Sequence, residues 1–65
     1  MGIKAKRIAP GIYDVNHNGI KYELERDEWG IWVLYDATNL EWHGREYCQD
    51  FHTKRDALHA IEFDD

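Results

Sequence analysis

The sequence predicts a small α+β domain in which a meander of three or four antiparallel strands packs on one C-terminal helix. Three observations predict it. An Asn18-Gly19 pair separates two runs of alternating polarity, residues 30–36 are rich in β-branched and aromatic side chains, and Thr53 precedes an amphipathic segment. The chain has 65 residues, of which 43% are hydrophobic and 14% aromatic. This composition is typical of one folded domain with one thin core.

The first two strands are predicted from their turn. Asn18-Gly19 is the preferred pair for a type I′ hairpin because both positions tolerate positive φ. The pairs predicted outward from this turn are His17 with Ile20, Val15 with Tyr22, Tyr13 with Leu24 and Gly11 with Arg26. Side chains alternate along a strand, so these residues share one face, which we call the core face.

Residues 30–36 are predicted to form the next strand. A turn around residues 27–30 pairs Leu24 with Val33 and Tyr22 with Tyr35, which keeps the core face apolar across three strands. In that register the opposite face, which we call the uncovered face, carries a mixture of apolar and acidic side chains. These are Ile12, Asp14, Glu23, Glu25, Trp32 and Leu34.

The C-terminal third is predicted to close the domain. Residues 37–46 show no sustained period and are expected to form a loop, and residues 47–51 a short fourth strand. Thr53 is expected to cap a helix over residues 54–62, with Ala57, Leu58 and Ile61 on one stripe. A helix this short is not stable alone, so it must dock on the core face. Residues 1–8 are expected to be a flexible basic arm and residues 64–65 a frayed tail.

Charge and cysteine content restrict the partners and the compartment. Residues 1–13 carry three basic side chains and no acid, so the formal charge of −5 leaves −8 for residues 14–65. A body this acidic repels phosphate, which disfavours general nucleic-acid binding. The single Cys48 cannot form an internal disulfide, so a cytoplasmic location is expected. The longest apolar run, residues 31–35, is too short to cross a bilayer, so no membrane partner is expected.

No motif indicates an enzyme, a cofactor or a metal. The chain has no serine, and its five glycines never cluster into a phosphate-binding loop. The spacing of His43, Cys48, His52 and His59 matches no compact zinc pattern. Glu23 and Glu25 point to one face of a strand, but a hydrolytic carboxylate pair needs a deep cleft that 65 residues do not easily enclose. A noncatalytic protein is therefore expected.

The uncovered face is the predicted binding surface. Trp32, Leu34 and Ile12 would lose water contact favourably when a partner covers them, and the acids around them favour a partner with a basic surface. The same acids permit a DNA-mimic role, in which carboxylates stand for phosphates. In a competing interpretation, residues 37–46 fold back and cover Trp32 with Leu40 and Trp42. A homodimer through a free sheet edge also stays open.

The segment from Phe51 to Ile61, Phe-His-Thr-Lys-Arg-Asp-Ala-Leu-His-Ala-Ile, resembles the closing run of the N-terminal arm-binding domains of phage tyrosine integrases. The resemblance implies a three-stranded sheet before the helix, a phage accessory protein that acts on a host or viral protein, and, as an alternative function, a DNA-binding accessory factor. In that family the sheet face opposite the helix binds DNA, whereas here that face is predicted to carry three acids and only Lys21 as a base. The DNA-binding alternative therefore relies on other basic side chains, namely Lys4, Lys6, Arg7, Lys54 and Arg55.

Overall fold

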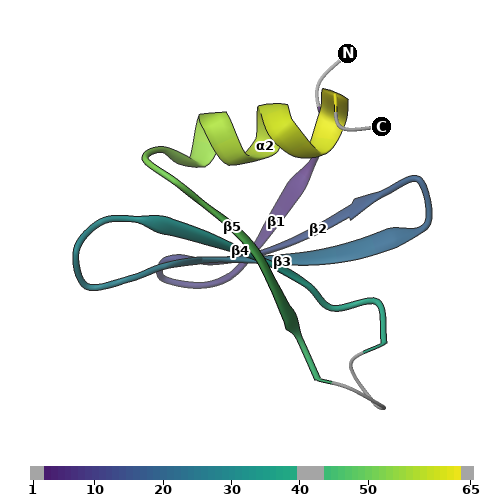
Figure 1. Ribbon diagram of the computed structural model, residues 1–65, viewed down its shortest axis with the longest axis horizontal. Helices are drawn as coiled ribbons and strands as arrows, with labels where there is room; N and C mark the ends of the chain where they lie inside the picture. Colours follow the sequence, from purple (N-terminus) through teal and green to yellow (C-terminus); the bar gives the residue numbers. More distant parts are fainter. Residues whose placement is uncertain (1–2, 40–43, 64–65) are drawn as a thin grey trace.

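The computed structural model describes residues 3–39 and 44–63, which form one antiparallel sheet and one helix (Figure 1). The elements are β1 (Ala5–Ala9), β2 (Ile12–His17), β3 (Ile20–Arg26), β4 (Trp32–Asp36), β5 (Glu46–Phe51) and α2 (Lys54–Phe63). The strands lie in the sheet in chain order, and α2 lies over one side of it. The α+β class with a C-terminal helix is confirmed, but the sheet has five strands rather than three or four.

The additional strand is β1, which occupies part of the segment expected to be a flexible arm. It pairs with β2, with Ala5 opposite Val15 and Lys6 opposite Asp14, and its register shifts between Arg7 and Ala9. The sequence did not predict this strand because Lys6 and Arg7 are adjacent, so polar and apolar residues do not alternate along it. The predicted fourth strand is confirmed as β5. The predicted tail, residues 64–65, lies outside the described residues.

The β2–β3 hairpin forms in the predicted register. His17 lies opposite Ile20, and the pairing continues to Tyr13 opposite Leu24. Asn18 and Gly19 both have positive φ, at 52° and 78°, as a type I′ turn requires. Local turn chemistry therefore determines this pairing.

The predicted register between β3 and β4 is wrong by one residue. Leu24 lies opposite Leu34 rather than Val33, and Tyr22 opposite Asp36 rather than Tyr35. The cause is the turn, in which the Asp27 carboxylate accepts hydrogen bonds from the backbone N–H groups of residues 29 and 31, both at 2.9 Å. The Asp27 N–H also donates to the carbonyl of Ile31 at 2.9 Å. These bonds extend the turn through residue 31, so every side chain of β4 changes face.

The core lies between the sheet and α2. Val15, Leu24 and Leu34 from the sheet pack with Ala57 and Ile61 from the helix, and all five are buried. Partly buried hydrophobic side chains surround them, namely Ile3, Ala5, Tyr13, Tyr22, Trp32, Phe51 and Leu58. The predicted helix cap is confirmed, because the Thr53 hydroxyl accepts a hydrogen bond from the Asp56 N–H at 3.0 Å. No helix in the described part of the chain is long and apolar enough to cross a lipid bilayer.

Candidate functional site: the uncovered sheet face

Two of the six predicted partner-binding residues lie on the other face of the sheet. Leu34 is 6% exposed within the core, and Trp32 packs against that core with its ring 5.8 Å from the ring of Tyr13. The one-residue change of register explains both positions. Trp32 and Leu34 therefore support the fold, and their predicted place on the uncovered face is corrected.

The other four predicted residues do share the uncovered face. Ile12 lies opposite Glu25, and Asp14 opposite Glu23, in the β2–β3 hairpin. Each of the four is half-buried. The competing interpretation, in which Leu40 and Trp42 cover this region, concerns residues outside the described ranges.

Val33 and Tyr35 take the places that were predicted for Trp32 and Leu34. Val33 lies opposite Glu25 on β3, and Tyr35 opposite Glu23. Strand β5 then adds its own side chains to the same face, where Asp50 pairs with Val33 and Tyr47 with Tyr35. The centre of the face is thus aromatic and carboxylate-rich.

Arg45, just before β5, organises this centre. Its Nη1 donates hydrogen bonds to Glu23 Oε1 and, at 2.8 Å, to Glu25 Oε1. Its guanidinium carbon lies 4.0 Å from the centroid of the Tyr35 ring, and the Tyr47 ring meets that ring edge-on at 6.4 Å. We call these five residues the Arg45 cluster.

The electrostatics of the cluster follow from these contacts. The hydrogen bond from Arg45 to Glu25 is the largest cause of the raised pKa of the guanidinium. Desolvation, the next largest effect, lowers this pKa, and the hydrogen bond to Glu23 raises it further. The hydrogen bond with Asp50 is the main cause of the raised pKa of Tyr47. Tyr47 is nevertheless 62% exposed. The cluster therefore holds a fixed arginine and two carboxylates beside an accessible aromatic ring.

Lysines gather at another part of the same face. Lys6 pairs with Asp14 and Lys21 with Asn16, and Lys4 joins them around one shallow hollow. Among the described residues, the uncovered face therefore carries four basic side chains, Lys4, Lys6, Lys21 and Arg45. It also carries four acidic ones, Asp14, Glu23, Glu25 and Asp50. The expectation of an acidic face with Lys21 as its single base is corrected, because β1 and Arg45 were not assigned to it.

The basic residues of the DNA-binding alternative do not form one surface. Lys4 and Lys6 lie on the uncovered face, whereas Arg7 pairs with Tyr13 of the core face. Lys54 lies over that same Tyr13 ring, with Nζ 4.3 Å from the centroid. Arg55 follows on the helix, so the five cations divide between the two sides of the sheet.

Sequence reasoning also missed Trp29, which at 78% exposure is the most exposed large hydrophobic side chain among residues 3–39 and 44–63. It lies in the turn that Asp27 organises, where Gly30 adopts a φ of 80°. An Asp followed three residues later by Gly is a turn signal, and a tryptophan between them is expected to project outward. Trp29 is thus the tryptophan that the turn exposes, in place of Trp32.

Residues 3–39 and 44–63 contain no group of three or more His, Cys, Asp or Glu side chains arranged to hold a metal ion. Comparisons with protein-family models, with curated protein sequences and with solved structures find no match to the chain. The resemblance of residues 51–61 to integrase arm-binding domains therefore stays a prediction. The candidate site rests on its own geometry.

Proposed function

We propose that the chain is a noncatalytic protein-binding module that docks a partner protein on the uncovered sheet face. The observation that carries this proposal is the Arg45 cluster, in which an arginine stacked on Tyr35 lies beside the exposed ring of Tyr47. Tyrosine and arginine are among the residues that contribute most to the binding energy of interfaces. Half-buried Ile12 and Val33 extend the apolar area next to the cluster.

Preorganisation also supports the proposal. The side chain of Arg45 is fixed by two carboxylates and one aromatic ring before any partner binds. Ordering a free arginine on binding costs about 0.5–1.5 kcal/mol. Most of that cost is absent here, since the folded domain already orders the side chain.

The charge of the face modifies the expected partner. Three lysines outnumber Asp14 in one region of the face, so a uniformly basic partner would be repelled there. We infer that the partner carries both signs of charge, with an acidic group opposite Lys4, Lys6 and Lys21. Arg45 offsets Glu23 and Glu25, so the carboxylates do not form the uncompensated series that a DNA mimic requires. That the chain is a phage accessory protein and that it is located in the cytoplasm both stay predictions.

The test uses two variants that each remove one exposed aromatic ring. Tyr47→Ala truncates the uncovered face, and Phe63→Ala truncates a 66% exposed ring at the end of α2. The tagged protein is purified from the cell that naturally expresses it, and co-purified proteins are quantified by mass spectrometry. We expect Tyr47→Ala to lower recovery of a specific partner about tenfold, or about 1.4 kcal/mol, and Phe63→Ala to leave it unchanged. Equal recovery with both variants contradicts the assignment of the face, and recovery of nothing above an empty bait contradicts the function.

One observation favours nucleic-acid binding by the same face as a second candidate function. Arg45 offsets two of the acids that were expected to repel phosphate, and three lysines gather beside them. A gel shift with duplex DNA over a range of salt concentrations tests it, with Lys21→Glu compared with Lys54→Glu, which changes the other side of the sheet. Binding that persists at about 0.2 M salt and is lost only in Lys21→Glu supports this function, and no shift at about 50 mM salt excludes it.

A further inference from the structure

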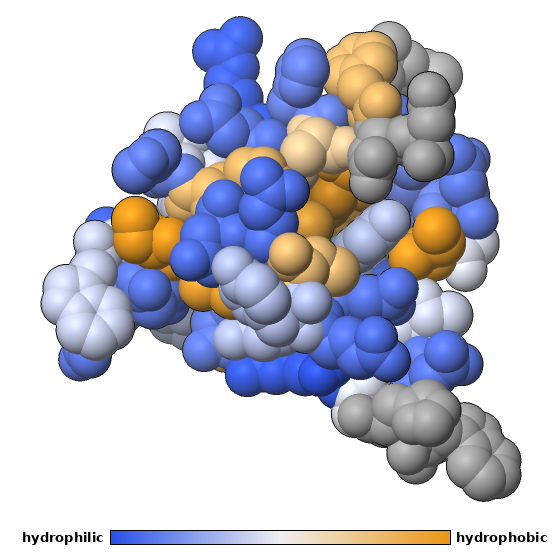
Figure 2. All heavy atoms as spheres, viewed as in Figure 1, coloured by the Kyte–Doolittle hydropathy of each residue, from blue (hydrophilic) through white to orange (hydrophobic). Residues whose placement is uncertain are grey.

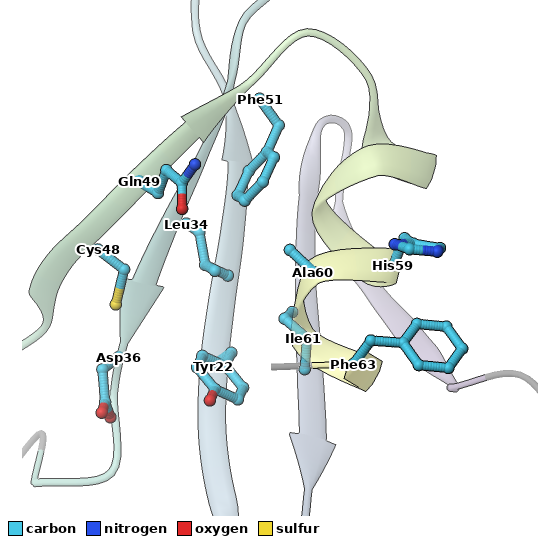
Figure 3. A pocket seen from close by; sticks show the side chains of 10 residues that line it. All are labelled: Tyr22, Leu34, Asp36, Cys48, Gln49, Phe51, His59, Ala60, Ile61 and Phe63. Carbon is cyan, nitrogen blue, oxygen red and sulfur yellow. The ribbon is translucent and has the colours of Figure 1, made fainter. Parts of the chain in front are cut away.

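A groove separates α2 from the last two strands on the side of the sheet away from the Arg45 cluster. Its volume is about 390 Å³, and its apolar wall is formed by Leu34 and Phe51 from the sheet and Ala60 and Ile61 from the helix. Ala60 and Ile61 point from α2 toward the strands, while His59 and Phe63 point away from them (Figure 3). In the space-filling view, hydrophobic side chains reach the surface between the helix and the sheet (Figure 2). The groove is therefore a place where the core opens to solvent.

Strand β5 forms the outer border of this groove and is the last strand of the sheet. Five of its six residues, from Glu46 to Asp50, are exposed. No strand among the described residues pairs with its outer side, so its outward backbone groups can accept another strand. The pairing with β4 shifts at Cys48, where the strand has one extra residue, so an added strand would contact two short stretches on either side of that point.

The border of the groove is acidic. Asp36 lines it, and Glu46 lies directly opposite Asp36 on β5. Desolvation is the main cause of the raised pKa of Cys48, and the negative charges of Asp36 and Glu46 raise it further. Among the groove-lining residues there is no lysine or arginine, and the single histidine, His59, points away. The acids therefore favour a cationic occupant.

A second copy of the chain fits this edge poorly. Both charged residues of β5, Glu46 and Asp50, are acidic, and the whole chain has a formal charge of −5. Pairing two such edges brings four carboxylates together without an added base, which destabilises cross-strand pairing. The occupant that matches both the apolar wall and the charge is a segment of a different protein.

We propose that the groove and the free edge of β5 bind an extended peptide segment of a partner protein that carries a lysine or arginine next to aliphatic side chains. The backbone of the segment adds to β5, its aliphatic side chains enter between Phe51 and Ala60, and its cation lies near Asp36 and Glu46. This surface is on the opposite side of the sheet from the Arg45 cluster, so the proposal does not depend on the proposed function.

The experiment uses a displayed library of random peptides about eight residues long, enough to span one strand. The wild-type protein is immobilised, the most enriched peptide is synthesised with a fluorophore, and its Kd is measured by anisotropy. Two variants alter the groove: Ala60→Gln fills it, and Glu46→Lys reverses its charge. The matched control, Glu28→Lys, makes the same charge change at an exposed position of the β3–β4 turn. Thermal melts show that each variant is folded, and because Glu46 is exposed its variant remains informative if Ala60→Gln does not fold.

We expect the enriched peptides to combine lysine or arginine with leucine, isoleucine or valine. Filling the groove should weaken binding about tenfold and reversing the charge about fivefold, while the control stays within about twofold. Enrichment of peptides without basic residues, equal affinity of all variants, or no enrichment overturns the proposal. Sedimentation of the wild-type protein as a dimer and of Glu46→Pro as a monomer also overturns the proposal, because a second copy then occupies the free edge of β5.

Discussion

Replacing Leu34 with Ala should destabilise the domain far more than the same replacement of its neighbour Val33. Strand β4 turns Leu34 toward the helix, where it is 6% exposed among the buried core residues. Truncating a buried leucine to alanine costs about 2–5 kcal/mol, and the lower half of that range applies because Leu34 lines an open groove that relaxes around the cavity. Val33 is half-buried on the uncovered face, so its truncation should cost about 1 kcal/mol or less.

These values are large for a chain of this size. A domain of 65 residues has a free energy of unfolding of roughly 3–10 kcal/mol. A loss of about 2–3 kcal/mol should therefore lower the Tm of Leu34→Ala by roughly 10–20 °C, whereas Val33→Ala should lose only a few degrees.

The assay is urea unfolding followed by tryptophan fluorescence and by far-ultraviolet circular dichroism. Both variants should keep the wild-type dependence of the unfolding free energy on urea, so that midpoints can be compared directly. If Val33→Ala is as destabilising as Leu34→Ala, the reasoning fails. That result would place Val33 opposite Leu24 and return Trp32 and Leu34 to the uncovered face.

Three further outcomes follow from local contacts. Thr53→Ala should cost about 1 kcal/mol by removing the bond from the Asp56 N–H, and Thr53→Ser should restore most of it, as measured by thermal melts. Arg45→Gln should lower stability by up to about 1 kcal/mol at low salt and by less at 1 M salt, since the side chain is partly exposed; a salt-independent loss would contradict an ionic contribution. Desolvation is the main cause of the raised pKa of the Cys48 thiol, and the charge of Asp36 raises it further. The rate of its reaction with a disulfide reagent should therefore rise at a higher pH than the rate for a free cysteine, and Asp36→Asn should bring that pH closer to the value for free cysteine. Between the ordinary and the raised pKa, the folded protein keeps a thiol proton that the unfolded chain has lost, so the contribution of Cys48 to stability falls as pH rises through that range. A reaction rate whose pH midpoint lies at or below that of free cysteine would contradict the raised pKa.

Local chemistry explains which parts of the fold could be predicted from the sequence. Asn18-Gly19 determines the β2–β3 hairpin because few other pairs accept two successive residues with positive φ. Thr53 determines where the helix begins because its hydroxyl binds a backbone N–H of the first turn. Both signals act over a few residues, and both are visible in the sequence as residue types.

The features that could not be predicted depend on contacts between distant or chemically unremarkable residues. The β3–β4 register depends on two hydrogen bonds to the Asp27 side chain, which extend the turn by one residue without changing the polarity pattern. Strand β1 is an edge strand in which Lys6 and Arg7 are adjacent and Ile8 is exposed, so it lacks the alternation that marks a half-buried strand. Arg45 reaches Glu23 and Glu25 across about twenty residues of sequence, in a segment with no period of its own.

Arg45 also determines how a partner can use the uncovered face. Glu23 and Glu25 are already paired with the Arg45 guanidinium, so a basic side chain of the partner must displace Arg45 to reach either carboxylate. The binding free energy gained is then only the difference between two similar ion pairs. Burial of Tyr47 requires no such exchange, because its ring is already edge-on to Tyr35 and most of it is exposed to water. Binding energy on this face should therefore come from the aromatic ring and the apolar area beside it, while the fixed charges select among partners. This is the reason that Tyr47, rather than either glutamate, is the substitution that tests the proposed function.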